Sequence, residues 1–384
     1  MVREDPKRKG LIYTGSEREV YLSFDDGEHW QSLRLNMPAT SVRDLIVKDD
    51  DLVVGTHGRG FWILDDITPL RQLDAATAAA AAVLFKPQIA YRVRWNMNTD
   101  TPLPPDEPGG LNPPDGAVIN YTLKSGASGP VTLEILDAAG KTIRRYSSAD
   151  RADRPDPATA PVPLYWYRPP HVLSAAAGMH RFEWDLHYQP VAGGGGRGGL
   201  PIAAVARNTV PSPNAPWAAP GTYTVKLTVD GKSYTQPLTV KMDPRVKTSP
   251  LGLTQQFTLS KQMYDGMVDA QKALQELRAL RERSATASAG RPDVRTFDQK
   301  LAALEGQADG GRGGPPAPGP VDAAETLSSI SGSLGTLMNL LQGADVAPTT
   351  QLVAAVNQRR AALAKVMAQW TALKAEARRL NLAI

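Results

Sequence analysis

The fold of the N-terminal region is decided by residues 23–30, which read Ser-Phe-Asp-Asp-Gly-Glu-His-Trp. Residues 20–22 (Val-Tyr-Leu) precede them and alternate apolar with polar character, as in a half-buried strand. Asp25 and Gly27 supply turn chemistry, because a carboxylate accepts hydrogen bonds from nearby backbone N–H groups and glycine adopts a positive φ without a Cβ clash. Trp30 begins the returning strand, and we expect its large apolar face to cover the turn. The stretch predicts a tight β-hairpin.

The spacing of Ser23, Asp25, Gly27 and Trp30 is S-x-D-x-G-x-x-W. This pattern resembles the Asp-box, the hairpin turn that repeats in BNR and sortilin-type β-propellers, and the resemblance implies a structural role for these four residues. Other segments extend the resemblance in one order along the chain: Leu11–Gly15, Arg43–Leu45, Gly55–Asp66, Asn112–Gly116, Arg181–Leu186, Pro220–Tyr223 and Asp243–Val246. Together they resemble the end of the propeller, and the region C-terminal to it, in large bacterial BNR-repeat, sortilin-like proteins that are often labelled glycosyl hydrolases.

This resemblance implies that the sequence is only the last part of a propeller protein. About one and a half four-stranded blades fit into residues 1–73, whereas a closed propeller has roughly four to eight blades. In the family, further blades and usually an export signal precede the matching region. We therefore expect a C-terminal fragment, or a gene model started at an internal Met, of a secreted or cell-envelope parent. Residues 1–10 carry charges with no apolar run after them, so they do not form a signal peptide, and the compartment stays open.

Composition narrows the class of protein but not its activity. The 384 residues are enough for two or three domains, and 33 Gly and 32 Pro indicate many turns and linkers. A net charge of +4 gives no reason to expect nucleic acid as a partner. With no cysteine, disulfides and thiol chemistry are excluded. No apolar run approaches the roughly 20 residues of a membrane-spanning helix.

Hydrophobic periodicity predicts a mainly β chain with a C-terminal all-α part. Residues 1–73 are the partial β-propeller blades, and residues 75–82 are a low-complexity connector. Residues 83–246 alternate with a period of two and predict an immunoglobulin-like β-sandwich, in which Asp230-Gly231 marks a hairpin. Two loop insertions, Asp150–Pro170 and Ala192–Pro220, are expected on its surface. Residues 250–384 change to a period of about 3.6 and predict an antiparallel helical bundle, interrupted by a flexible Gly- and Pro-rich loop at 306–320.

Candidate chemical groups favour structural roles. The carboxylates Asp25, Asp26, Asp65 and Asp66 lie in turns or at strand ends, and side chains of adjacent strand residues point to opposite faces, which does not suit a glycosidase pair. The five histidines form no H-x-x-x-H or H-E-x-x-H pattern, so no zinc site is predicted. We predict no catalytic residue, no metal ligand and no cofactor in this chain.

Arg59, Phe61 and Trp62 follow a Gly-punctuated turn and allow two interpretations. An arginine with aromatic neighbours can line a ligand surface of a propeller. Alternatively, Phe61 or Trp62 fills the space between blades while Arg59 bonds backbone carbonyls. We favour the second interpretation.

Two functions remain open after these exclusions. The leading one is a non-catalytic interaction or scaffold portion of a larger secreted or envelope BNR-repeat protein, whose propeller binds a protein or a glycan. The alternative is a fragment of a glycoside hydrolase-like or other hydrolase, with its active site on the missing blades. We also expect residues 1–73 to be the least stable part, because unpaired strand edges there would face solvent.

Overall fold

The computed structural model describes residues 1–94, 102–104, 106–107, 110, 113–152, 155–191, 214–306 and 325–382. They belong to two compact units. The first unit holds Met1–Leu186 and Pro220–Asp243 and is β-rich. The second holds four long helices together with the bridge between His187 and Trp217. The chain therefore has a β-rich N-terminal region of several sheets and a C-terminal helical region, as the sequence predicts at this level.

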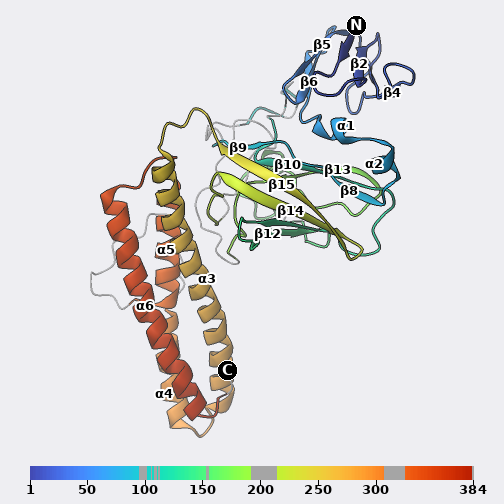
Figure 1. Ribbon diagram of the computed structural model, residues 1–384. Coiled ribbons are helices and arrows are strands. Elements are labelled where there is room, and N and C mark those ends of the chain that lie inside the picture. The colour runs from blue at the N-terminus through green and yellow to red at the C-terminus, as the bar shows by residue number, and fades with distance from the viewer. Residues whose placement is uncertain are drawn as a thin grey trace. The chain divides into compact units, whose positions relative to one another are not determined.

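Two small antiparallel sheets form the N-terminal part of the first unit (Figure 1). The first runs in the order β1 (Val2–Glu4), β2 (Ile12–Gly15), β3 (Val20–Ser23) and β4 (Gln31–Ser32). The second runs in the order β5 (Val42–Lys48), β6 (Asp51–Thr56) and β7 (Phe61–Leu64). The sequence pattern predicts strands at Leu11–Gly15, Val42–Val47 and Leu52–Thr56, which match β2, β5 and β6 to within one residue, whereas it does not predict β1.

The two small sheets share one hydrophobic core. Its members alternate along the strands with exposed residues, because successive strand side chains point to opposite faces. The fully buried members come from both sheets and from the segment that follows β7: Leu11, Tyr13, Leu45, Leu52 and Ile67. Residues 1–67 thus bury apolar surface against themselves.

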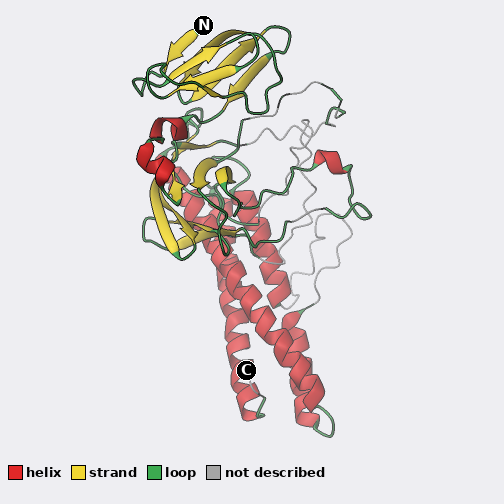
Figure 2. Ribbon diagram, turned by 90° about the vertical axis from the view of Figure 1, so that its right-hand side faces the viewer, coloured by secondary structure: helices red, strands yellow, loops and turns green. Residues whose placement is uncertain are grey.

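Two short helices follow the small sheets, α1 (Thr68–Gln72) and α2 (Ala75–Ala79) (Figure 2). The sequence predicts only a connector at α2. Asp74 starts this helix with a capping box, in which its carboxylate accepts from the Thr77 N–H at 2.7 Å and the Thr77 hydroxyl accepts from the Asp74 N–H at 2.7 Å. A side-chain cap and a run of alanine, the best helix former, are sufficient for this single turn.

Two larger sheets complete the first unit and curl into a half-barrel (Figure 1). The three-stranded sheet has the order β13 (Gly178–Trp184), β10 (Ala117–Leu123), β8 (Ala82–Leu84). The five-stranded sheet has the order β12 (Thr142–Ser147), β11 (Thr132–Leu136), β14 (Gly221–Val229), β15 (Lys232–Met242), β9 (Ala90–Arg92). All pairs are antiparallel except β15 with β9, which is parallel. The predicted hairpin is confirmed, because Asp230 and Gly231 connect β14 to β15 with φ of 47° and 79°.

The core between these sheets consists of the residues that alternate inward. Trp184 is fully buried and meets Tyr223 edge to face, with ring centroids 5.4 Å apart. Burial raises the pKa of Tyr223 to about 12, so this phenol stays neutral. Of the predicted surface insertions, the described part of 150–170 is exposed or half-buried, whereas most of 192–220 lies outside the described residues.

Four helices form the second unit: α3 (Pro250–Ala287), α4 (Pro292–Glu305), α5 (Leu327–Leu341) and α6 (Thr350–Arg379) (Figures 1 and 2). In α4 and α5 the buried residues recur at three- and four-residue steps, as the predicted period of about 3.6 requires. Ser249, Thr326 and Thr349 cap the N-termini of α3, α5 and α6 with their side-chain oxygens. Met263, Leu334 and Trp370, from three different helices, are buried in the common core.

The end of α4 and the start of α5 touch each other. Gly306 ends α4 with a φ of 71°, and a Cβ added there would lie 2.2 Å from Oγ1 of Thr326. The predicted flexible loop lies, apart from Gly306, outside the described residues. The C-terminal end of α4 and the N-terminal end of α5 therefore lie next to each other.

Two segments outside the helices pack on them. His187 and Trp217 form an isolated antiparallel bridge and bring their rings to 4.0 Å. The Trp217 N–H donates to Oε1 of Gln342 at 2.6 Å, and the Tyr264 hydroxyl donates to the Gln189 carbonyl at 2.7 Å. These contacts fasten both flanks of the second insertion to α3 and to the end of α5.

Candidate functional site

The turn at residues 23–30 closes on its own side chains. The Ser23 hydroxyl donates to Oδ1 of Asp25 at 2.7 Å and accepts from the Gly27 N–H at 2.9 Å. Oδ1 of Asp25 also accepts from the His29 N–H at 2.9 Å. Asp26 and Gly27 take the positive φ values of 62° and 96° that the turn requires. The serine and the aspartate thus satisfy backbone donors of the turn.

These bonds fix the ionisation state of Asp25. The backbone N–H of His29, followed by the Ser23 hydroxyl and the His29 ring, lowers the pKa of this carboxyl to about 2. A carboxylate that is held ionised by donors of its own turn is a poor general acid. Its geometry suits a structural role.

Trp30 covers the turn less completely than the sequence predicts. Its side chain lies against Gly27, where an added Cβ would be 3.5 Å from Cζ2 of the indole. The residue nevertheless remains 42% exposed. The indole thus contacts the turn on one side and stays open to solvent on the other, because the short strand β4 that follows places no further apolar residue over the ring: both Gln31 and Ser32 are exposed.

Arg59, Phe61 and Trp62 do not act as one group. Trp62 packs against the core of the small sheets, and its Nε1 donates to the Arg59 carbonyl at 3.1 Å. Phe61 points away from that core and is 83% exposed. Within the described part of the chain, the exposed Arg59 guanidinium has no ionic or hydrogen-bonding partner. Trp62 therefore fills space in the core of the small sheets and Phe61 presents surface, whereas the expected bond from the Arg59 guanidinium to a backbone carbonyl is absent among the described residues.

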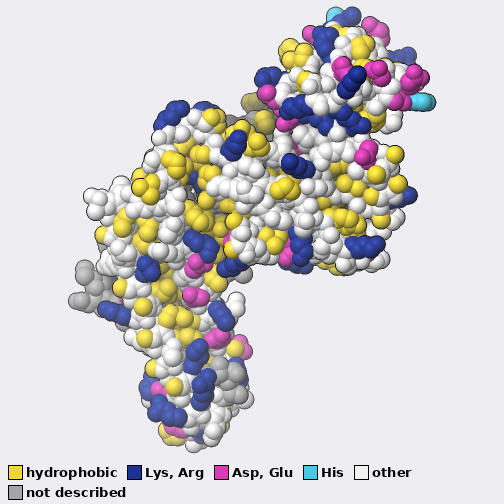
Figure 3. Space-filling view, viewed as in Figure 1, with side chains coloured by type: hydrophobic (Ala, Val, Ile, Leu, Met, Phe, Trp, Pro, Cys, Tyr) yellow, Lys and Arg dark blue, Asp and Glu magenta, His cyan; other side chains and the backbone are white. Residues whose placement is uncertain are grey.

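The outer face of the β5–β7 sheet carries a row of apolar side chains between charged ones. Across the three strands, Ile46 pairs with Val53 and Val53 with Ile63, so their side chains form one row on this face. Ile46 and Ile63 are 46% and 57% exposed. The Phe61 ring lies over Gly55, whose added Cβ would be 3.6 Å away. Figure 3 shows hydrophobic side chains reaching the surface near β5 and β6 among charged ones. We call Ile46, Val53, Phe61 and Ile63 the outer-face patch.

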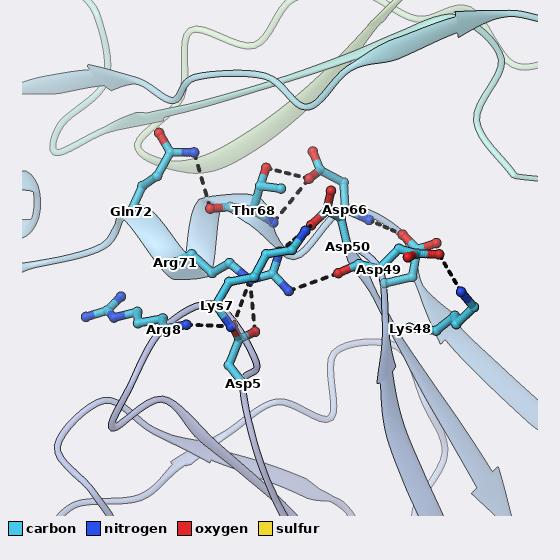
Figure 4. A network of polar contacts seen from close by, with 11 residues as sticks. Asp5, Lys7, Arg8, Lys48, Asp49, Asp50, Asp66, Thr68, Arg71 and Gln72 are labelled. Carbon is cyan, nitrogen blue, oxygen red and sulfur yellow. Dashed lines mark hydrogen bonds and ion pairs between the residues drawn. The ribbon is translucent and has the colours of Figure 1, made fainter.

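A buried ion-pair network fastens α1 to the small sheets (Figure 4). Arg71 on α1 bonds Asp5 through Nε at 2.9 Å and also pairs with Asp50. The Asp5 side chain is fully buried and accepts from the N–H groups of Lys7 and Arg8 at 2.8 and 2.9 Å. All donors to Asp5 belong to this local network, which therefore stabilises the fold rather than facing a ligand. Sequence reasoning missed it because its members lie 21 and 66 positions apart.

A second buried network joins the end of the small sheets to the larger ones. Oδ2 of Asp66 accepts from Nδ2 of Asn120 on β10 at 2.7 Å. Arg181 on β13 donates from Nε to Oδ1 of Asn120 at 3.3 Å and from Nη2 to the carbonyls of Asp65 and Asp66. Burial raises the pKa values of both aspartates. Asp66 is only 2% exposed, so it cannot reach a substrate.

The described residues offer little for metal or membrane chemistry. They contain no cluster of three or more potential metal-ligating side chains. Among the helices in the described ranges, none is both long and apolar enough to cross a bilayer. His29 lies within 2.7 Å of Asp25 at the exposed turn, and His180 contacts the Ala176 carbonyl at 2.8 Å. These two histidines thus have local partners within their own segments.

Comparison with known proteins adds no assignment. No protein-family model matches the chain, and neither a curated protein nor a solved structure matches it.

Proposed function

We propose that this chain is a non-catalytic interaction or scaffold portion of a larger secreted or envelope BNR-repeat propeller protein. In this proposal residues 1–73 are the last propeller blades, residues 83–246 are an immunoglobulin-like sandwich, and residues 250–384 are an antiparallel helical bundle. The observation that carries the proposal is the outer-face patch on the β5–β7 sheet, with Phe61 83% exposed.

The topology of the small sheets supports the blade assignment. Two consecutive antiparallel meanders share one core, which is the arrangement of neighbouring propeller blades. A blade inside a closed ring is covered on both faces, whereas the β5–β7 sheet is covered on one. An apolar sheet face with an unpaired edge strand favours association with another sheet. The partner we propose is therefore a further blade, which would pack on Ile46, Phe61 and Ile63.

The carboxylates support a non-catalytic role for the chain. Asp25 is occupied by its own turn, Asp66 by Thr68 and Asn120, and Asp5 by Arg71. Because each of these three carboxylates is held by donors of its own surroundings, none is available as one of the two opposed carboxylates that the glycosidase mechanism uses. The parent's ligand in this proposal is a protein or a glycan at the complete propeller.

The experiment compares self-association of the purified chain with that of the double variant Phe61→Ser/Ile63→Ser. We expect the wild-type chain to associate through its free sheet face in sedimentation velocity, and the double variant to stay monomeric with an unchanged melting temperature. Leu251→Ser is the matched control, since Leu251 is 77% exposed on α3. Equal association of the wild type and the double variant would contradict the docking face.

A second assay addresses the hydrolase alternative. The chain is incubated with sialosides, xyloglucan and nitrophenyl glycosides, and we expect no turnover. Hydrolysis that disappears on substitution of a single Asp or Glu would show that the chain itself is catalytic.

A further inference from the structure

A small cleft opens where the edge strands of the two larger sheets come together. Tyr146 on β12 and Phe182 on β13 meet edge to face, with ring centroids 4.7 Å apart. The His171 ring stacks on Phe182 at 4.8 Å, with an interplanar angle of 23°. Beside these rings lies a cavity of about 240 Å³ that Leu173 also lines. Because Phe182 and Leu173 are buried, the cleft has a fixed and mostly apolar floor.

Three exposed polar side chains stand at the rim of the cleft. Asp150 uses Oδ2 to accept from the Ser147 N–H at 2.6 Å, which leaves Oδ1 open. Within the described ranges, the Arg151 guanidinium has no partner, and neither ring nitrogen of His171 has a hydrogen bond. The rim thus offers one carboxylate acceptor, one guanidinium donor, and one imidazole that can do either.

The two opposite charges at the rim restrict the class of ligand. An anion attracted by Arg151 would face the Asp150 carboxylate, and a cation attracted by Asp150 would face Arg151. A neutral ligand whose groups both donate and accept hydrogen bonds avoids both repulsions. An apolar floor under a polar rim further requires a ligand with an apolar face.

We propose that this cleft binds one neutral pyranose ring. Hydroxyl groups both donate and accept, so they match Asp150, Arg151 and His171, while the C–H face of the ring packs against the Tyr146 and His171 side. Pockets for drug-sized ligands occupy roughly 300–1,000 Å³, so a cavity of about 240 Å³ admits one ring and not an extended chain. The site lies on the larger sheets and is independent of the outer-face patch and of the proposed propeller.

The test is a titration of the full chain followed by NMR. Methyl glucoside, galactoside, mannoside and N-acetylglucosaminide are the neutral probes, and glucosamine and glucuronate are the charged ones. We expect saturable binding of at least one neutral probe, with a Kd on the order of 1 mM as is usual for so small a ligand, and weaker binding of both charged sugars.

Substitutions at the rim test whether the sugar binds in this cleft. Arg151→Met removes the donor and keeps the length of the side chain. Asp150→Asn removes the charge and, because its single oxygen keeps the bond from the Ser147 N–H, presents an NH₂ donor to the cleft in place of the open carboxylate oxygen. We expect Arg151→Met to weaken binding at least tenfold and Asp150→Asn to improve the relative binding of glucuronate. Lys141→Met, at an exposed position in the turn before β12, is the matched control and should bind as the wild type.

Three results would overturn the proposal. They are no saturable binding of any neutral probe, unchanged binding in Arg151→Met, and tighter binding of a charged sugar than of every neutral one. Because both variants change exposed side chains, circular dichroism should show an unaltered fold, and a variant that did not fold would be replaced by Arg151→Gln.

Discussion

Nδ2 of Asn120 on β10 donates to the buried carboxylate of Asp66, 2.7 Å away. The amide oxygen of Asn120 accepts from Nε of Arg181 at the same time. The amide therefore has one orientation only, because turning it would place its NH₂ group against the guanidinium. This single side chain bonds a carboxylate on one side and a cation on the other.

The orientation of this amide leads to a prediction for a residue swap. Asp66→Asn should cost about 1–3 kcal/mol, since an NH₂ group then faces the NH₂ group of Asn120. Asn120→Asp should cost more, because two carboxylates meet in a buried place. The double variant restores a donor opposite an acceptor and keeps an acceptor for Arg181, so its stability should be close to that of the wild type. Urea unfolding of the four proteins gives the coupling energy, and strictly additive costs would contradict the hydrogen-bond assignment.

The ion pair of Arg71 with Asp5 should matter far more than surface pairs. Arg71→Met leaves the fully buried Asp5 carboxylate without its guanidinium, and we expect a loss of roughly 3 kcal/mol in the free energy of unfolding. Lys48→Met removes an exposed pair with Asp49 and should leave stability unchanged. The denaturant midpoints of the two variants measure this difference. Equal midpoints would show that burial does not determine how much free energy of unfolding is lost with an ion pair.

The turn at residues 23–30 should respond to acid in a defined window. The pKa of Asp25 is lowered to about 2 in the folded turn, against about 3.9 in an unfolded chain. Its contribution to stability is therefore present above about pH 4 and is lost as the pH falls towards 2. Asp25→Ala should lower the melting temperature at pH 7 and lower it much less at pH 2, where about half of the Asp25 carboxyls are protonated in the folded turn. Glu28→Ala, an exposed neighbour, serves as control, and a cost for Asp25→Ala that did not change with pH would contradict this account.

The partial exposure of Trp30 sets the cost of removing it. A fully buried tryptophan costs about 3–5 kcal/mol when truncated to alanine. Trp30 is 42% exposed, so Trp30→Ala should cost clearly less than Trp184→Ala at the fully buried position on β13. Urea unfolding of both variants tests the order. A larger loss at Trp30 would mean that the ring supports more of the turn than its exposure indicates.

Sequence patterns predicted the elements that repeat a period over many residues. The stripe of Leu327, Ile330 and Leu334 sufficed for α5, and the alternation along Tyr223–Val229 sufficed for β14. They did not predict β8 and β9, because three residues carry no measurable period and each pairs with a strand far along the chain. The sequence also predicted turns whose residue types determine their backbone conformation, such as Asp230-Gly231 between β14 and β15.

The candidate sites were predictable only where the chemistry is local. Ser23, Asp25 and Gly27 bond within one turn, so their structural role could be argued from spacing. The exposure of Phe61 could not, since it depends on which sheet covers the face of β7. Likewise, the cleft is lined by Asp150, in the turn after β12, and by Phe182, on β13. The two residues are far apart in the sequence and meet only because the two larger sheets pack together.

Gly306 and Thr326 are in contact although 19 residues separate them in the sequence. The number of residues between α4 and α5 therefore does not set the distance between the two helix ends. The segment between them can gain or lose residues without changing the register of either helix, because its two anchors already coincide. Loop-closure entropy grows only slowly with length, so such changes have little thermodynamic cost. A labelling tag or a whole folded domain can therefore be inserted between Gly306 and Thr326, and we expect the end of α4 and the capped start of α5 to keep their structure.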